Sequence, residues 1–148
     1  VPFEAIVTEA LKRVEGQINE KQVEVQVGSG FPVVHVDKER LIEVIQNLVD
    51  NAVKFMGKQP SPHIEMGFNM QDGNPIFFVR DNGIGIKKEF QKKIFGLFDK
   101  LNPATDGTGV GLALVKRIIE VHGGSIWVES QEGMGATFYF SLEKNNEN

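Results

Sequence analysis

The feature that most constrains the fold is the one-sided apolar pattern of three helical segments. The clearest is DKERLIEVIQNLVDNAVKFM, residues 37–56, whose apolar side chains recur at helical spacing after Asp37, a favourable N-cap residue. Residues 3–20 and 112–122 carry the same kind of stripe. A helix with one apolar face needs a second layer to cover it, so the pattern predicts helices packed on a sheet or on other helices.

Segments that alternate apolar and polar residues predict the covering layer. QVEVQVG, HIEMGFNM and PIFFVRD are typical of strands, and SIWVES with ATFYFSL closes the chain as a hairpin. The order of segments predicts an α/β two-layer sandwich, in which a mixed sheet of about five strands packs on three main helices. We expect one domain over residues 1–142 and a polar tail over 143–148.

Composition excludes several kinds of protein. The chain has no cysteine, so disulfides, thiolate metal sites and thiol nucleophiles are ruled out. Its net charge of -4 argues against nucleic acid as the main partner. Its apolar runs are much shorter than the roughly 20 residues of a transmembrane helix, and no basic-plus-apolar signal segment opens it. We therefore expect no direct membrane contact from this domain.

The long helix carries two asparagines one turn apart, although asparagine is a poor helix former. Glu43, Asn47, Asn51 and Lys54 form a polar stripe beside the apolar one. One interpretation is a solvated helix face. The other is a metal–nucleotide site, because an amide oxygen is a hard, neutral ligand for Mg²⁺ and a lysine one turn away is placed for phosphate.

A glycine-containing segment, RDNGIGI, follows a predicted strand. Gly83 and Gly85 would let the backbone turn sharply and approach a ligand. Asp81 is a candidate base reader, since a carboxylate accepts from the adenine amino group and meets a repelling acceptor on guanine. The alternative is a plain Asp-Asn-Gly turn.

The segment DGTGVGLAL places Gly107, Gly109 and Gly111 directly before a helix. Free backbone N–H groups and the positive helix end then face one point, which predicts a phosphate site. The spacing matches neither the Walker nor the Rossmann glycine pattern. The alternative is a flexible hinge before the helix.

The remaining motifs are weaker. Phe95 is expected in the core, and the loop over residues 99–106 has the features of a short lid from which Lys100 could reach a terminal phosphate. QEGMGATF reads as a tight turn. The three histidines are far apart in sequence and show no metal-ligand spacing, so structural or surface roles are expected for them.

Taken in order, QNLVDNAVKF, DNGIGI, IFGLFDKL, GTGVGLAL and GMGATF resemble the five boxes of the histidine-kinase catalytic domain. That domain belongs to the gyrase, heat-shock chaperone, histidine kinase and mismatch-repair ATPase superfamily, which has the Bergerat ATP-binding fold. The resemblance covers essentially the whole chain, and residues 99–130 are similar to histidine kinases of the phytochrome-like type. It implies a two-layer α/β sandwich that binds ATP.

The resemblance also implies roles for individual residues. Asn51 is expected to ligate Mg²⁺, and Asn47 to support the phosphate end of the site. Lys54 and Lys100 are expected to contact phosphates during transfer, and Asp81 to read the adenine amino group. The other residues implied to contact the nucleotide or to shape its site are Phe55 beside the adenine or ribose, Gly83, Ile84, Gly85, Ile86, Phe98, Gly107, Thr108, Gly109, Val110, Gly111, Leu112, and Thr137 at the adenine end.

Two departures refine the resemblance. The hydrolysing relatives carry a glutamate where Asn47 stands, and an amide cannot act as that base, so transfer to a protein acceptor is expected rather than rapid hydrolysis. Leu97 replaces a common proline and Lys100 stands where arginine is frequent, which affects the expected lid contact more than the nucleotide site.

The acceptor histidine of the family has no match here, since the three histidines read HVD, HIE and HGG. The resemblance therefore implies a protein-histidine kinase domain whose partners are a dimerisation domain that bears the histidine and a response-regulator receiver domain. It implies a cytoplasmic location for this domain, whether or not the parent kinase is anchored in a membrane. The alternatives are a nucleotide-sensing module without phosphotransfer, an ATP-clamp hydrolase and a serine-kinase relative.

Overall fold

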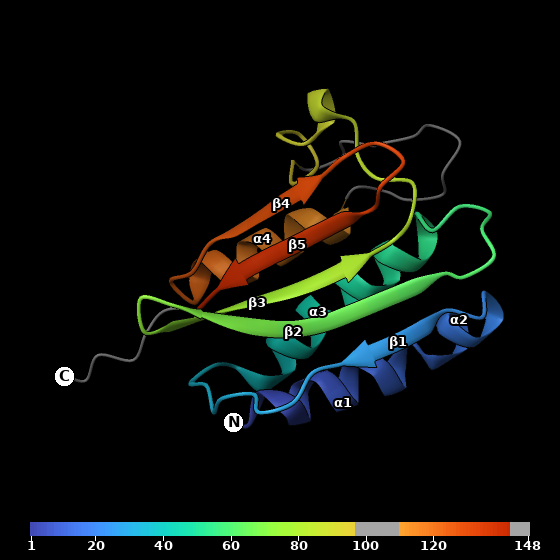
Figure 1. Cartoon of the computed structure of the whole chain (residues 1–148). Coiled ribbons are helices and arrows are strands. Elements are labelled where there is room, and N and C mark those ends of the chain that lie inside the picture. The colour runs from blue at the N-terminus through green and yellow to red at the C-terminus, as the bar shows by residue number, and fades with distance from the viewer. Residues whose placement is uncertain (97–109, 143–148) are drawn as a thin grey trace.

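The computed structural model describes residues 1–96 and 110–142, which form one five-stranded sheet with helices on one face (Figure 1). The predicted two-layer sandwich is confirmed. Its strands are β1 (Glu24–Val27), β2 (His63–Gln71), β3 (Asn74–Asp81), β4 (Ile126–Ser130) and β5 (Ala136–Ser141). Its helices are α1 (Phe3–Arg13), α2 (Glu15–Glu20), α3 (Lys38–Lys54) and α4 (Val110–Val121), with a 3₁₀ turn, η1, at Lys88–Phe90.

The sheet is mixed, with strand order β1-β2-β3-β5-β4. β1 pairs in parallel with β2, and all the other neighbours are antiparallel. Asp72 and Gly73 both have positive φ in the β2–β3 turn, as a two-residue hairpin requires. This order places the ends of β3 and β4 and the start of β5 at one end of the sheet.

Strand alternation separates a covered face of the sheet from an open one. Phe77, Val79 and Asp81 of β3 are buried, as are Ala136 and Phe138 of β5. Their neighbours along each strand point to the face that carries no helix. The direction of each side chain at the strand ends therefore decides which face of the sheet it can serve.

Helix α3 lies at the centre of the helical layer, between α1 and α4. Its N-terminus begins as predicted, with the Asp37 carboxylate accepting from the Arg40 N–H at 3.2 Å. Phe55 is its half-buried C-cap residue. The predicted apolar stripe of α3 is fully buried: Leu41, Val44, Ile45, Leu48 and Ala52.

The N-terminal helix differs from the prediction of one helix over residues 3–20. The helix is interrupted at Val14, where φ is -110°, so that α1 and α2 are separate helices. A β-branched residue followed closely by Gly16 lowers helix propensity, and the buried Val14 side chain favours the break. Phe3 anchors α1 to the sheet by stacking on Phe77, with ring centroids 4.0 Å apart.

Within the described residues, the segment between β3 and residue 96 contains only a short helical turn. The chain forms η1 and then turns, and Leu97 and Phe98 lie outside the described residues. Among the residues that the structure describes, no helix has both the length and the apolar character of a membrane span.

Candidate functional site

Asp81 is the buried ionisable group at the end of β3. Its side-chain oxygen Oδ1 accepts from the Gly83 N–H at 2.8 Å and from the Ala136 N–H at 3.3 Å. Burial raises the pKa of the Asp81 carboxyl above its ordinary value, and these two hydrogen bonds lower it by a smaller amount. A carboxylate with one oxygen held by the backbone is oriented to accept from a ligand with the other.

Close backbone approaches bring the predicted glycine segments together around Asp81. A Cβ atom on Gly135 would lie 2.1 Å from the Asp81 carbonyl oxygen, and one on Gly85 would lie 2.1 Å from the Gln131 carbonyl oxygen. Both glycines have positive φ. Only glycine fits such positions, so the loop after β3 and the β4–β5 turn can pack directly against each other.

The end of helix α3 joins the same group. The Ile84 N–H donates to the Phe55 carbonyl oxygen at 2.9 Å, and a Cβ on Gly83 would lie 2.3 Å from that oxygen. The side chain of Ile84 is exposed, whereas that of Ile86 is buried in the core. Phe55 of the first motif therefore meets Gly83 and Ile84 of the second in space.

Asn47 lies between α3 and α4. Its Nδ2 donates to the Glu43 carbonyl oxygen at 2.8 Å, and a Cβ on Gly111 would lie 2.9 Å from its Oδ1. The side chain is half-buried, so a purely solvated face does not describe this position. Gly111 allows the start of α4 to approach Asn47, and the buried Leu112 holds that start to the core.

Asn51 and Lys54 continue the stripe toward the Asp81 end of α3. Asn51 is half-buried, and the Lys54 Nζ lies 3.4 Å from the Asp50 carboxylate in a partly exposed ion pair. Such a pair contributes little to stability, so Lys54 can exchange Asp50 for a phosphate group at small cost. The predicted residues Phe98, Lys100, Gly107, Thr108 and Gly109 lie outside the described residues, and so does the side chain of Val110.

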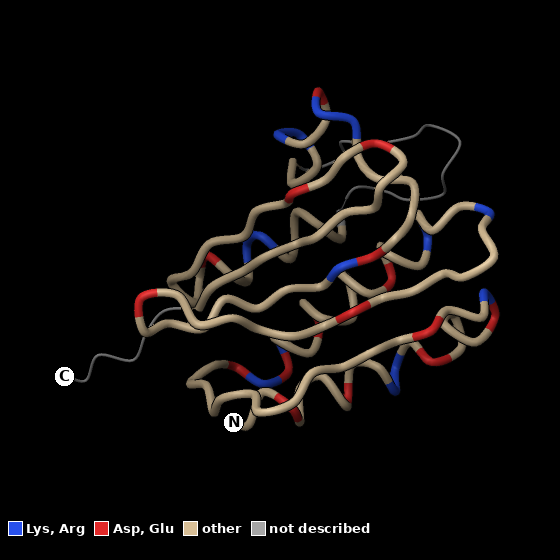
Figure 2. Tube along the Cα trace, viewed as in Figure 1, with Lys and Arg blue, Asp and Glu red and all other residues tan. Residues whose placement is uncertain are grey.

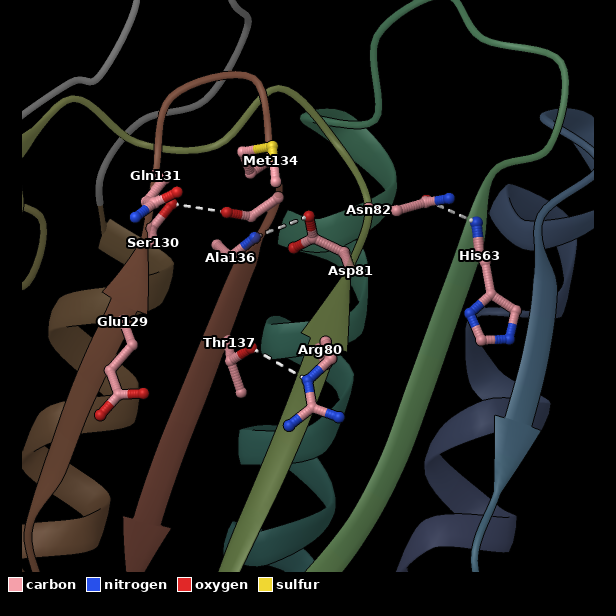
Figure 3. Close-up of a pocket in the computed structure, with 11 residues that line it drawn as sticks. His63, Arg80, Asp81, Asn82, Glu129, Ser130, Gln131, Met134, Ala136 and Thr137 are labelled. Carbon is pink, nitrogen blue, oxygen red and sulfur yellow. Dashed lines mark hydrogen bonds between the residues drawn. The ribbon is translucent and has the colours of Figure 1, made fainter.

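The side chain of Thr137 lies on the other face of the sheet from that of Asp81. Thr137 alternates with the buried Ala136 and Phe138, so its side chain points to the open face, away from the helices. Its Oγ1 accepts from the Arg80 Nε at 3.2 Å (Figure 3). The residue of this motif that reaches the Asp81 carboxylate is Ala136, through its backbone N–H. Thr137 lines the same cavity as Asp81, and its role at the adenine end stays a prediction.

Sequence reasoning missed a cavity on the open face, of about 540 Å³ (Figure 3). Its walls include the side chains of His63, Arg80 and Glu129. Arg80 donates to Glu65 at 3.1 Å as well as to Thr137, and its guanidinium lies 4.7 Å from the centre of the Phe78 ring. Arg80 is thus satisfied within the protein. The cavity adjoins the Asp81 end of the sheet, since Asp81, Ser130 and Ala136 also line it.

A second missed feature is a group of exposed lysines around η1, close to the end of the sheet where Asp81 lies (Figure 2). A chain of net charge -4 is thus locally positive at this end, which favours the approach of anions. The run KKEFQKK is the signal that could have found it. The lysines are Lys87, Lys88, Lys92 and Lys93.

Metal binding by the described residues alone is not supported. Among residues 1–96 and 110–142, no group of three or more His, Cys, Asp or Glu side chains could hold an ion. His122 has a structural role, since its Nε2 accepts from the Asp37 N–H at 3.1 Å. The amide oxygen of Asn51 is of the kind that suits Mg²⁺ arriving with phosphate ligands, because Mg²⁺ needs few protein ligands when phosphates complete its shell.

Comparison with known proteins agrees with this geometry. Residues 36–146 match the family described as histidine kinase-, DNA gyrase B-, and HSP90-like ATPase. The chain is 48% identical over 140 residues to the methanogenesis regulatory histidine kinase FilI of Methanothrix harundinacea, covering 95% of this chain and 16% of that protein. It is 43% identical over 143 residues to the phytochrome-like protein Cph1 of Synechocystis sp., covering 95% of this chain and 19% of that protein.

A similar structure is that of histidine kinase ThkA in complex with the response regulator protein TrrA. The TM-score is 0.78 at 26% identity, and the match covers 100% of this chain and 42% of that chain. The chain thus spans less than a fifth of the length of the two curated relatives.

Proposed function

Because the chain belongs to the histidine kinase-, DNA gyrase B-, and HSP90-like ATPase family, we propose that it is the ATP-binding catalytic domain of a two-component sensor histidine kinase. In this role it transfers the γ-phosphoryl group of Mg-ATP to a histidine on a separate dimerisation domain. The bond between the γ-phosphorus and the β,γ-bridging oxygen breaks, a bond from phosphorus to an imidazole nitrogen forms, and ADP leaves.

The observation that carries the proposal is the environment of Asp81. The carboxylate is buried, and both of its hydrogen bonds within the described residues end on one oxygen, Oδ1. An adenine amino group donates to the other oxygen, whereas the corresponding carbonyl of guanine would face a carboxylate and be repelled. Gly83 and Gly85 let the loop after β3 pack closely on the backbone of Phe55 and Gln131, which shapes the floor of the proposed site.

The phosphate end of the site is assigned to helix α3 and the start of α4. Lys54 contacts phosphates after leaving Asp50, and the lysines around η1 attract the polyphosphate. Asn51 would hold Mg²⁺ together with the phosphates, with Asn47 in support. The ion, when bound, neutralises phosphate charge, and the N–H groups at the start of α4 add to this effect.

Asn47 favours transfer over hydrolysis. Its amide donates to Glu43 and cannot take a proton from water. A neutral imidazole is already a nucleophile, so the domain needs no strong base, and positioning with charge neutralisation carries most of the rate.

The proposed partners are the dimerisation domain that bears the acceptor histidine and a response-regulator receiver domain. The complex of the similar kinase ThkA with TrrA supports the second of these. A domain that uses ATP as a donor works in the cytoplasm, and that location is part of the proposal.

A phosphotransfer assay tests this function. The chain is incubated with γ-labelled ATP, Mg²⁺ and a dimerisation fragment of the same kinase, and we expect label on the acceptor histidine. Asn51→Ala should remove the labelling with the fold intact, whereas Asn69→Ala, on an exposed part of β2, should not.

Three other outcomes of this assay would contradict the proposal. Binding of ATP without transfer would indicate a nucleotide-sensing module, and rapid release of phosphate would indicate a hydrolase. Label on a serine of a protein partner would indicate the serine-kinase relatives.

A further inference from the structure

The side chain of Ser130, the last residue of β4, forms hydrogen bonds to two segments that lie outside β4. Its Oγ accepts from the Ile86 N–H at 2.8 Å. It donates to the Gly135 carbonyl oxygen at 2.7 Å, the dashed line that starts at Ser130 in Figure 3. The first bond reaches the loop after β3, and the second reaches the residue before β5. One hydroxyl therefore connects the two segments that flank Asp81.

Gln91 adds hydrogen bonds to the same junction, the contact between the loop after β3 and the β4–β5 turn. Its Nε2 donates to the Ile86 carbonyl oxygen at 2.9 Å and to the Ser130 carbonyl oxygen at 3.0 Å. The Gly133 N–H also donates to the Ile84 carbonyl oxygen at 2.6 Å. Both polar atoms of the Ile86 backbone are thus held by side chains, which fixes the loop against the β4–β5 turn.

The junction bears directly on Asp81. The two N–H groups that hold its Oδ1 belong to Gly83, in the loop, and to Ala136, next to Gly135. These are the two segments that Ser130 connects. If they moved apart, the carboxylate would lose one or both partners and its fixed direction.

We propose that Ser130 is a positioning residue for adenine recognition, acting through the two backbone N–H groups that orient the Asp81 carboxylate. The inference rests on the proposed function, because it assumes that Asp81 reads adenine. Gln91 supports Ser130 from the other side of the junction.

The test compares Ser130→Ala with the unchanged chain by calorimetric titration with Mg-ATP over a range of pH. We expect about tenfold weaker ATP binding, the change that corresponds to roughly 1.4 kcal/mol. We also expect the pH midpoint of ATP binding to rise, since loss of the two N–H donors leaves burial as the main influence on the pKa of Asp81. Ser130→Thr, which keeps the hydroxyl, should restore both quantities.

Ser141→Ala is the matched control. Ser141 lies at the other end of the same sheet, and its hydroxyl likewise accepts from a backbone N–H, that of Ser125, at 3.1 Å. It should change neither ATP affinity nor the pH midpoint. If Ser130 only stabilised the fold, Ser130→Ala would lower the unfolding temperature and leave the pH midpoint of ATP binding unchanged.

The possible outcomes are distinct. If the unchanged chain does not bind ATP, the proposed function fails. If it binds ATP and Ser130→Ala has the same affinity and midpoint, the role of Ser130 is wrong. Should Ser130→Ala not fold, Gln91→Ala is the second variant, for which we expect a smaller weakening of about threefold and a midpoint shift in the same direction; no midpoint shift would overturn the inference.

Discussion

At the scale of single residues, the site depends on one buried carboxylate. Asp81 is only 8% exposed, and burial outweighs its two hydrogen bonds in setting its pKa. A charged form that is costly to bury is retained at functional sites more often than in ordinary cores. Asp81 thus reduces stability in exchange for a directed acceptor.

Replacing Asp81 by asparagine separates these two effects. Asparagine keeps an Oδ1 for Gly83 and Ala136 but removes the buried charge. A carboxyl whose pKa is raised on folding stabilises the protein while it is protonated, and that contribution is lost as pH rises through its folded pKa. The unfolding temperature of Asp81→Asn relative to the unchanged chain should therefore rise between acidic and mildly alkaline pH.

The same variant should bind ATP between about 10- and 100-fold more weakly, since a hydrogen bond to a charged acceptor is lost. Thermal unfolding and ATP titration of one preparation measure both effects. A variant that is less stable at alkaline pH, or that binds ATP as well as before, would contradict this account of Asp81.

At the scale of elements, the β4–β5 turn is fitted against the end of β3. Gly133 and Gly135 both have positive φ, and the space around them differs. A Cβ on Gly135 would collide with the Asp81 backbone, whereas a Cβ on Gly133 would meet nothing within 4 Å. Gly133 is needed for its backbone conformation alone, whereas Gly135 is needed also for the close approach to Asp81.

This difference makes the two glycines a matched pair. Gly133→Ala should cost about 1 kcal/mol of unfolding free energy, the usual penalty of a left-handed alanine. Gly135→Ala should cost at least about 2 kcal/mol more, because β3 and β5 must separate near Asp81. Denaturant unfolding of both variants checks the difference, and equal costs would mean that the close approach has no energetic weight.

Prediction from sequence succeeded for elements whose signal is local. The apolar stripe of residues 41–52 and the alternation in β2, β3 and β5 gave the helices and strands correctly, because burial on one face has a fixed period. The break at Val14 was missed because the apolar stripe continues through Val14, although Val14 and Gly16 lower the local helix propensity. The face of the sheet that Thr137 occupies could not be predicted, because a turn motif does not reveal on which face the following strand begins.

At the scale of the whole molecule, the sandwich assembles a site from segments that are far apart in sequence. Residues near positions 55, 83 and 135 meet at one end of the sheet through backbone contacts. The predicted histidine kinase-type family is confirmed by the match over residues 36–146. Ser130 and Gln91 could not be predicted, since their contacts depend on which loops the fold brings together. The individual site residues stay predictions.

The most direct measurement is calorimetric titration of the chain with ATP, with and without Mg²⁺, and with GTP for comparison. The account predicts that the chain binds ATP, that Mg²⁺ strengthens this binding, and that GTP binds at least about tenfold more weakly, because Asp81 repels the guanine carbonyl. Equal affinity for ATP and GTP, or the absence of any ATP binding, would contradict the central claim that this end of the sheet is an adenine nucleotide site.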